Sequence, residues 1–152
     1  MLAADLFSWI IDGKIGGMPK PDVFGSLEQN LQILSQKYNI KTILSLTEYQ
    51  IDKNAVLAHG MNYFHFPIDD FTAPSLAQFQ EFEKIYTMDN FPIAVHCFAG
   101  MGRTGTILAA ALLIEGYSPE DAISKVRSLR PGSIENDMQI ESIRSFYDYL
   151  TK

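Results

Sequence analysis

The sequence contains a single cysteine, Cys97, among its 152 residues. One cysteine excludes a disulfide within the chain and any zinc site that is built from several cysteines. Basic residues are also few, because 12 Lys and Arg stand against 18 Asp and Glu, which gives a net charge of −6. Such a charge repels polyanions and argues against general binding of nucleic acid or of anionic membranes. A phosphate group would therefore have to be bound by a local arrangement of residues that acts against the net negative charge of the chain.

Long apolar runs are missing as well. The longest run, Ile107–Ile114, is far shorter than the ~20 residues that cross a bilayer. The first residues include Asp5 and lack the basic start of a secretory signal, and the last four, YLTK, carry no prenylation signal. These absences predict a cytoplasmic protein without a membrane partner, and the length predicts one domain over residues 1–152.

Short strand-like runs alternate with helical patterns along the chain. The expected strands are Ser8–Ile11 and Lys14–Gly17 around an Asp-Gly turn, then Lys41–Leu46, Asn62–Phe66 and Pro92–His96. The expected helices run from Ser26 to near Tyr38, from Ser75 to about Met88 with Leu76, Phe79, Phe82, Ile85 and Tyr86 inward, over Arg103–Glu115, from Ser118 to about Arg130, and through Ile140–Leu150. This order predicts an α/β fold in which helices flank a central, mainly parallel, twisted sheet.

The segment Val95–Gly105, VHCFAGMGRTG, joins an expected buried strand to an expected buried helix. Its small residues allow a tight loop whose amides converge at the helix N-terminus, where they form an anion site. The planar guanidinium of Arg103 can bind two phosphate oxygens at once, and the same amides are expected to favour the thiolate form of Cys97. A nucleophile and an anion site in one loop predict phosphoryl transfer to sulfur. The expected phosphate-binding residues are Phe98, Ala99, Gly100, Met101, Gly102 and Arg103.

The string HCFAGMGRTG resembles the His-Cys-x5-Arg-Thr/Ser-Gly signature of the cysteine-based protein tyrosine phosphatase superfamily. The chain is similar to the small atypical dual-specificity phosphatases of the VHZ type and to compact prokaryotic tyrosine phosphatases. Further matching stretches lie at residues 8–21, 43–48, 66–75 and 130–139. The resemblance implies the fold of this superfamily, a phosphocysteine intermediate, and no cofactor or metal ion.

The resemblance also assigns roles to individual residues. It makes Cys97 the nucleophile and Arg103 the residue that binds the phosphoryl oxygens in both steps. Thr104 matches the hydroxyl that hydrogen-bonds the sulfur, and His96 matches the histidine that orders the loop and supports the thiolate. Gln139 aligns with a glutamine that positions the hydrolytic water in some relatives.

The general acid of relatives is an Asp that follows Ile-Pro or Trp-Pro, whereas this chain reads Ile-Asp-Asp-Phe over residues 68–71. The register through the shared Ile and Phe assigns the acid to Asp70 and leaves Asp69 as the alternative. Glu48 and Glu135 match further acidic positions of the family.

Gly100, Gly102 and Gly105 also satisfy the spacing of a dinucleotide-binding loop. A dinucleotide fold needs a second parallel strand after the helix, whereas two more helices follow here, separated by the break at Pro131–Gly132. The glycines are better explained by amides that close on a phosphate.

The sequence thus predicts a monomeric phosphatase that hydrolyses protein phosphotyrosine, with phosphoserine, phosphothreonine and small aryl phosphates as further substrates. Phosphate, vanadate and sulfate-like anions are expected to bind its loop. Hydrolysis of phosphoinositides or RNA 5′-phosphates is an alternative, although relatives with phosphoinositide specificity carry loop lysines where this chain has Phe98 and Met101, and Lys14, Lys20 and Lys53 are scattered. A pseudophosphatase that only binds phosphorylated partners is the non-enzymatic alternative.

Overall fold

The computed structural model describes residues 1–152. Its elements in chain order are the 3-10 helix η1 (Ala3–Leu6), β1 (Ser8–Ile11), β2 (Ile15–Met18), α1 (Leu27–Gln36), β3 (Thr42–Ser45), α2 (Lys53–Ala58), β4 (Asn62–His65), α3 (Leu76–Thr87), β5 (Ile93–His96), α4 (Gly102–Ile114), α5 (Pro119–Leu129) and α6 (Asp137–Leu150). As expected, Ser26, Ser75 and Ser118 cap α1, α3 and α5, each accepting a hydrogen bond from the amide three residues on. No helix combines the length and the apolar composition that crossing a bilayer requires.

The five strands form one sheet in the order β1-β2-β5-β3-β4. β1 is antiparallel to β2, and all other neighbours are parallel, so the prediction of a mainly parallel sheet is confirmed. Met18, His96, Ser45 and His65 end the four parallel strands in register with one another. The loops that follow these strands therefore leave the sheet at one edge, which is where open α/β sheets bind ligands.

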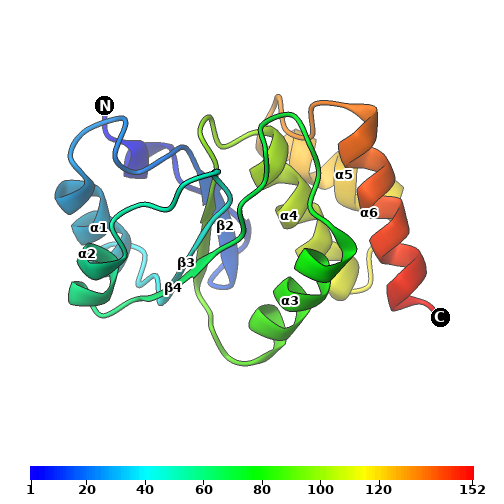
Figure 1. Cartoon of the computed structure of the whole chain (residues 1–152), viewed down its shortest axis with the longest axis horizontal. Helices are drawn as coiled ribbons and strands as arrows, with labels where there is room; N and C mark the ends of the chain where they lie inside the picture. The colour runs from blue at the N-terminus through cyan, green and yellow to red at the C-terminus, as the bar shows by residue number, and fades with distance from the viewer.

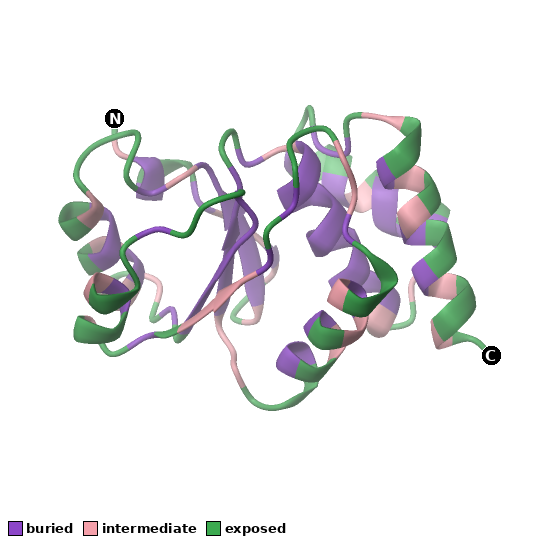
Figure 2. Cartoon of the chain, in the orientation of Figure 1, coloured by how far each residue is buried: buried purple, intermediate pink, exposed green.

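Helices cover both faces of the sheet. In Figure 1, α1 and α2 lie on one side and α3 to α6 on the other, with the four strand ends at the upper edge. The larger core packs α4 between the sheet and its neighbours α3, α5 and α6, and the smaller core lies under η1, α1 and α2. Figure 2 shows that burial is concentrated in the sheet and in α4. The site loop therefore begins and ends in the two most buried parts of the fold.

Two elements and one core residue differ from expectation. The helices η1 and α2 are absent from the sequence-based prediction, since α2 has six residues of which only Val56 is buried. So short a segment carries no readable helical period. The expectation that Leu76 faces the core is wrong, because it is the first residue of α3 and 47% exposed.

Candidate active site

The loop Cys97–Met101 joins the end of β5 to the start of α4 at the upper edge of the sheet in Figure 1. Its turn depends on Gly100, which has a φ of +78°. That left-handed conformation is unfavourable for residues with a Cβ. A Cβ at Gly100 would also lie 2.6 Å from the carbonyl carbon of Met18. The close approach of β2 and the tight turn therefore both require glycine.

The backbone amides from Phe98 to Gly102 donate no hydrogen bond to any other atom of the chain. The carbonyl side of the loop is occupied, because Phe98 O accepts from the Lys20 amide at 3.0 Å and Gly100 O from Arg130 Nη2 at 2.5 Å. The free amides precede α4, where the helix dipole adds partial positive charge. The loop therefore presents a set of donors suited to an anion.

The sulfur of Cys97 is buried at the start of this loop, with the residue 3% exposed. Thr104, in the first turn of α4, donates its hydroxyl to Cys97 Sγ at 3.0 Å. A donor of this kind stabilises a thiolate more than a thiol. The structure thus brings the expected sulfur and the expected hydroxyl into direct contact.

The guanidinium of Arg103 is buried and faces three groups from the other strand-end loops. Nη1 donates to Glu48 Oε1 at 2.8 Å and to Ile68 O at 2.7 Å, and Nη2 lies 3.4 Å from Asp70 Oδ1. The hydrogen bond from Arg103 lowers the pKa of Glu48, so this carboxylate stays charged. Arg103 Nε is buried without a partner. Nη1 is thereby fixed by two hydrogen bonds, Nη2 is ion-paired with Asp70, and Nε is the one guanidinium nitrogen without a partner in the chain.

The two adjacent aspartates of the loop after β4 differ in their surroundings. Asp70 Oδ1 accepts from the Phe71 amide at 2.9 Å and faces Arg103. Asp69 uses its carbonyl to accept from Thr72, and its side chain forms no ion pair. Both line the same pocket, but only Asp70 contacts the arginine.

The ring of His96 is buried and bonded on both nitrogens. Nε2 lies 2.5 Å from Ser45 Oγ, and Nδ1 lies 3.1 Å from Cys97 O. Burial lowers the pKa of His96 to about 4, so the ring is uncharged at neutral pH. Any support that His96 gives to the sulfur therefore comes from the position of the loop and not from a positive charge.

This uncharged histidine predicts a pH dependence of stability. Because the ordinary pKa of 6.5 falls to about 4 on folding, the unfolded chain binds a proton between these values that the folded chain does not. The free energy of unfolding should therefore fall by about 3 kcal/mol from pH 6.5 to pH 4. Urea titrations across this range test it. His96→Gln should remove most of this pH dependence of the free energy of unfolding, whereas His59→Gln should retain it. An unchanged pH dependence in His96→Gln would show that His96 is not its cause.

Gln139 and Glu135 lie against the other end of the loop. Gln139 Oε1 accepts from the Glu135 amide at 2.7 Å, and its Nε2 donates to Thr72 O at 3.2 Å. A Cβ on Gly102 would lie 2.9 Å from Gln139 Nε2 and would collide with the Glu135 carboxylate. Both expected residues are therefore next to the start of α4, and Gln139 also ties the acid loop to α6.

Lys20 also lines the candidate site. The expectation that the scattered lysines give the phosphate loop no basic surroundings is wrong for Lys20, because it lines the same pocket as Arg103. The Lys20 amide bonds to Phe98 O, and its ammonium pairs with Asp22 at 3.1 Å. Its position two residues after β2 is the signal that could have located it, since β2 ends at the same edge as β5.

Arg130 is a second residue whose role the sequence does not show. It is 6% exposed, and its guanidinium donates to Ser8 Oγ at 2.6 Å and to Gly17 O at 2.8 Å, besides Gly100 O. Burial lowers the pKa of Arg130. Arg130 thus fastens the loop to β1 and β2.

We expect Arg130→Lys to destabilise the fold by about 2–4 kcal/mol, because one ammonium cannot replace these buried hydrogen bonds. Urea denaturation measures the loss directly. Arg144→Lys is the matched control, since Arg144 is half exposed and pairs only with Glu141 on its own helix. Equal and small losses in both variants would show that Arg130 does not hold the loop.

The candidate site opens into a pocket of about 520 Å³. Its lining comprises Lys20, Thr47, Glu48, Tyr49, Asp69, Asp70, Phe98 and Arg103. Tyr49 is 86% exposed and Phe98 is 55% exposed, so two aromatic rings stand at the rim. The pocket therefore combines a buried cation, three carboxylates and an aromatic border.

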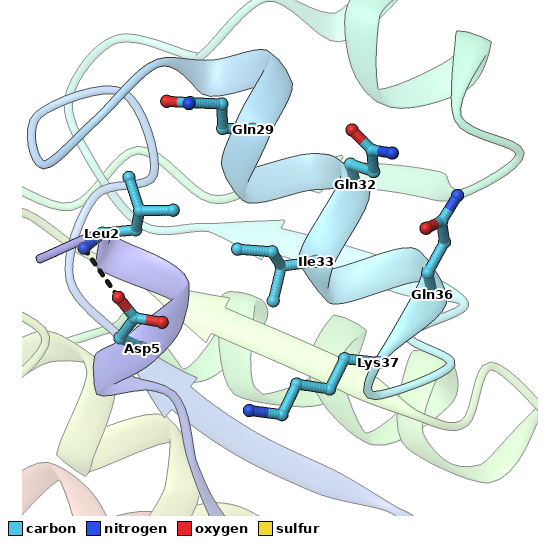
Figure 3. Close-up of a pocket in the computed structure, with 7 residues that line it drawn as sticks. All are labelled: Leu2, Asp5, Gln29, Gln32, Ile33, Gln36 and Lys37. Carbon is cyan, nitrogen blue, oxygen red and sulfur yellow. Dashed lines mark hydrogen bonds between the residues drawn. The ribbon is translucent and has the colours of Figure 1, made fainter.

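A separate hollow of about 420 Å³ lies between η1 and α1 (Figure 3). It is lined by Leu2, Asp5, Gln29, Gln32, Ile33, Gln36 and Lys37. The Leu2 amide donates a hydrogen bond to the Asp5 carboxylate at 2.8 Å. None of the residues of the Cys97 loop lines it, so it is distinct from the candidate site.

The chain is similar to several known phosphatases. The family model Tc-R-P, described as "Polymorphic toxin system, DSP-PTPase phosphatase", matches residues 16–117. Mouse protein tyrosine phosphatase type IVA 3 is 30% identical over 116 residues, which are 73% of this chain and 66% of that protein. Zebrafish dual specificity protein phosphatase CDC14AB is 28% identical over 141 residues, covering 87% of this chain and 23% of that protein. The chain therefore spans from under a quarter to two thirds of these curated relatives.

Solved structures show the same fold. Tk-PTP in its active form has 27% identity and a TM-score of 0.81, with 94% of this chain and 97% of that one covered. PTPMT1 in complex with PI(5)P has 20% identity and a TM-score of 0.83, with 97% of each chain covered. Fold and loop together define a cysteine-based phosphatase of the tyrosine and dual-specificity class. Within this superfamily, the chain belongs to the DSP-PTPase phosphatase family that is described for polymorphic toxin systems.

Proposed function

We propose that this chain hydrolyses phosphate monoesters through a phosphocysteine intermediate on Cys97, with residues 1–152 acting as one catalytic domain. The observation that carries the proposal is the composition of one loop. It holds a buried thiol bonded to Thr104, a row of amides without partners in the chain, and a guanidinium with a free Nε. Such a loop supplies a nucleophile and a preformed site for the charge of the transferred phosphoryl group.

In the first step, the loop amides together with Nε and Nη2 of Arg103 bind the phosphoryl oxygens. Glu48 and Ile68 O keep Nη1 in place, so that the guanidinium is oriented before the substrate arrives. The Cys97 thiolate attacks phosphorus, the bond from phosphorus to the ester oxygen breaks, and Asp70 donates its proton to the leaving oxygen. The products are the free alcohol or phenol and phosphocysteine.

In the second step, water attacks the phosphorus of phosphocysteine and Asp70 takes its proton. The phosphorus–sulfur bond breaks, and the departing thiolate accepts the hydrogen bond from Thr104. Gln139, whose Nε2 lies beside the start of α4, is the group that we assign to the orientation of this water. Inorganic phosphate leaves and the enzyme returns to its starting state.

The substrate that the pocket supports best is phosphotyrosine in a peptide, with phosphoserine and phosphothreonine as further substrates. The exposed rings of Tyr49 and Phe98 border the pocket and suit an aryl group. Three carboxylates against two cations disfavour polyphosphorylated ligands. Lys20 favours a second candidate, a phosphoinositide or an RNA 5′-phosphate, but its ammonium is already paired with Asp22.

The direct test is release of p-nitrophenol from p-nitrophenyl phosphate by the purified chain in the presence of a metal chelator. We expect turnover and competitive inhibition by vanadate, because vanadate mimics the five-coordinate transition state. Absence of turnover with every aryl phosphate would overturn the proposal. If a phosphopeptide still bound to such an inactive chain, the protein would act as a phospho-binding pseudophosphatase.

A further inference from the structure

Beside the proposed active site lies an apolar groove of about 360 Å³. The term apolar groove is used below for the hollow bordered by Leu6, Phe24, Phe98, Met101, Leu129 and Pro131. Leu6, Phe24 and Leu129 are each between 43% and 48% exposed, although their side chains are large and apolar. A cluster of exposed apolar side chains around one hollow is typical of a binding surface.

The walls of the groove are held in place by buried hydrogen bonds. The fully buried Asn30 accepts from the Ala4 amide at 2.8 Å and donates to Phe24 O at 2.9 Å. It thereby joins η1, which carries Leu6, to the segment that carries Phe24. Arg130, which also lines the groove, is bonded to the Cys97 loop through Gly100 O. The groove is therefore preformed, which lowers the entropic cost of binding.

The apolar groove adjoins the phosphate pocket. Phe98 lines both hollows, and the loop between Cys97 and Arg103 contributes Ala99 and Met101 to the groove. An extended peptide advances about 3.3–3.6 Å per residue, so neighbours of a phosphorylated residue in the loop reach past Phe98. The groove thus lies where the residues next to a bound phosphotyrosine would be.

We propose that the apolar groove binds a large apolar side chain that flanks the phosphorylated residue of a peptide substrate. This inference rests on the proposed function and adds a specificity determinant to it. The charge of the site favours a peptide over an anionic lipid surface, because Glu48, Asp69 and Asp70 line the neighbouring pocket. Leu129, at the end of α5, is the residue through which the groove is best tested, since it lies outside the phosphate loop.

The experiment compares two phosphotyrosine peptides that differ only in the flanking residues, leucine on both sides in one and serine in the other. We expect the leucine peptide to have a kcat/KM about 5–20-fold higher, through KM, because partial burial of one apolar side chain has an effect of this size. Leu129→Gln should reduce this preference to near unity and leave hydrolysis of p-nitrophenyl phosphate unchanged. Phe24→Ser tests a second residue of the groove in the same way.

The matched control is Leu57→Gln on α2, because Leu57 and Leu129 are both 48% exposed. Leu57→Gln should retain the full preference. Equal kcat/KM for the two peptides, or a preference that survives both groove variants, would overturn the inference while turnover of p-nitrophenyl phosphate upheld the phosphatase. If Leu129→Gln instead lowered only the turnover of a dioctanoyl phosphoinositide, the groove would hold an acyl chain and the peptide assignment would be wrong. If the unsubstituted chain hydrolysed no aryl phosphate at all, the proposed function itself would be overturned.

Discussion

Replacement of Cys97 by serine is expected to lower kcat for p-nitrophenyl phosphate by at least about 10⁴-fold, as loss of a catalytic nucleophile does in other enzymes. The serine hydroxyl is protonated at neutral pH and is a poor nucleophile without a general base beside it. The ring of the preceding residue, His96, is bonded to Ser45 and to Cys97 O and has no nitrogen left to serve as that base. The rate of nitrophenol release in the two proteins measures the effect.

The Cys97→Ser variant should still fold and bind phosphorylated ligands. Serine is close in volume to cysteine, and its oxygen retains a hydrogen-bonding partner in Thr104. The loop amides and Arg103 are unchanged, so the variant should still bind a phosphotyrosine peptide when no vanadate is present. A variant with normal thermal stability and undiminished turnover would show that Cys97 is not the nucleophile.

Replacement of Asp70 by asparagine is expected to lower turnover by about 10²–10⁴-fold, because an amide cannot donate a proton to the leaving oxygen. The effect depends on the leaving group, since phenolate needs protonation more than p-nitrophenolate does. The loss should therefore be larger for phenyl phosphate than for p-nitrophenyl phosphate. Steady-state rates with both esters give the comparison.

Asp69→Asn is the matched control for Asp70→Asn. Both residues line the pocket, but only Asp70 faces Arg103, at 3.4 Å. Asp69→Asn should therefore leave the turnover of both esters nearly unchanged. If the large, leaving-group-dependent loss appeared in Asp69→Asn and not in Asp70→Asn, the assignment of the acid would have to be exchanged.

Local features of this chain could be predicted from sequence because their causes are local. The serine caps of three helices satisfy amides within three residues of themselves, and these helices begin where they were expected. The loop at Cys97 has the same property, since the left-handed Gly100 and the start of α4 lie within a few residues of the sulfur. The predicted contact of Thr104 with the sulfur depends on the same short segment.

The remaining parts of the site are formed between segments far apart in sequence. The hydrogen bond between Arg103 and Glu48 joins residues that are 55 positions apart in sequence, and the one between Arg130 and Ser8 joins residues 122 positions apart. Such contacts depend on the order of the strands and on the edge at which their loops gather, which no local pattern encodes. The position of Lys20 beside the pocket could not be predicted for this reason. The six-residue α2 was missed because a single buried residue gives no period.

The most direct test of this account is chemical trapping of the intermediate. The chain is mixed with an aryl phosphate, and the reaction is quenched within one turnover. The protein is then digested, and the mass of the peptide that contains Cys97 is measured by mass spectrometry. We expect one phosphoryl group on the Cys97 sulfur, appearing with the phenol and disappearing as phosphate is released. Turnover without phosphate on this peptide, or phosphate on another residue, would contradict the phosphocysteine mechanism.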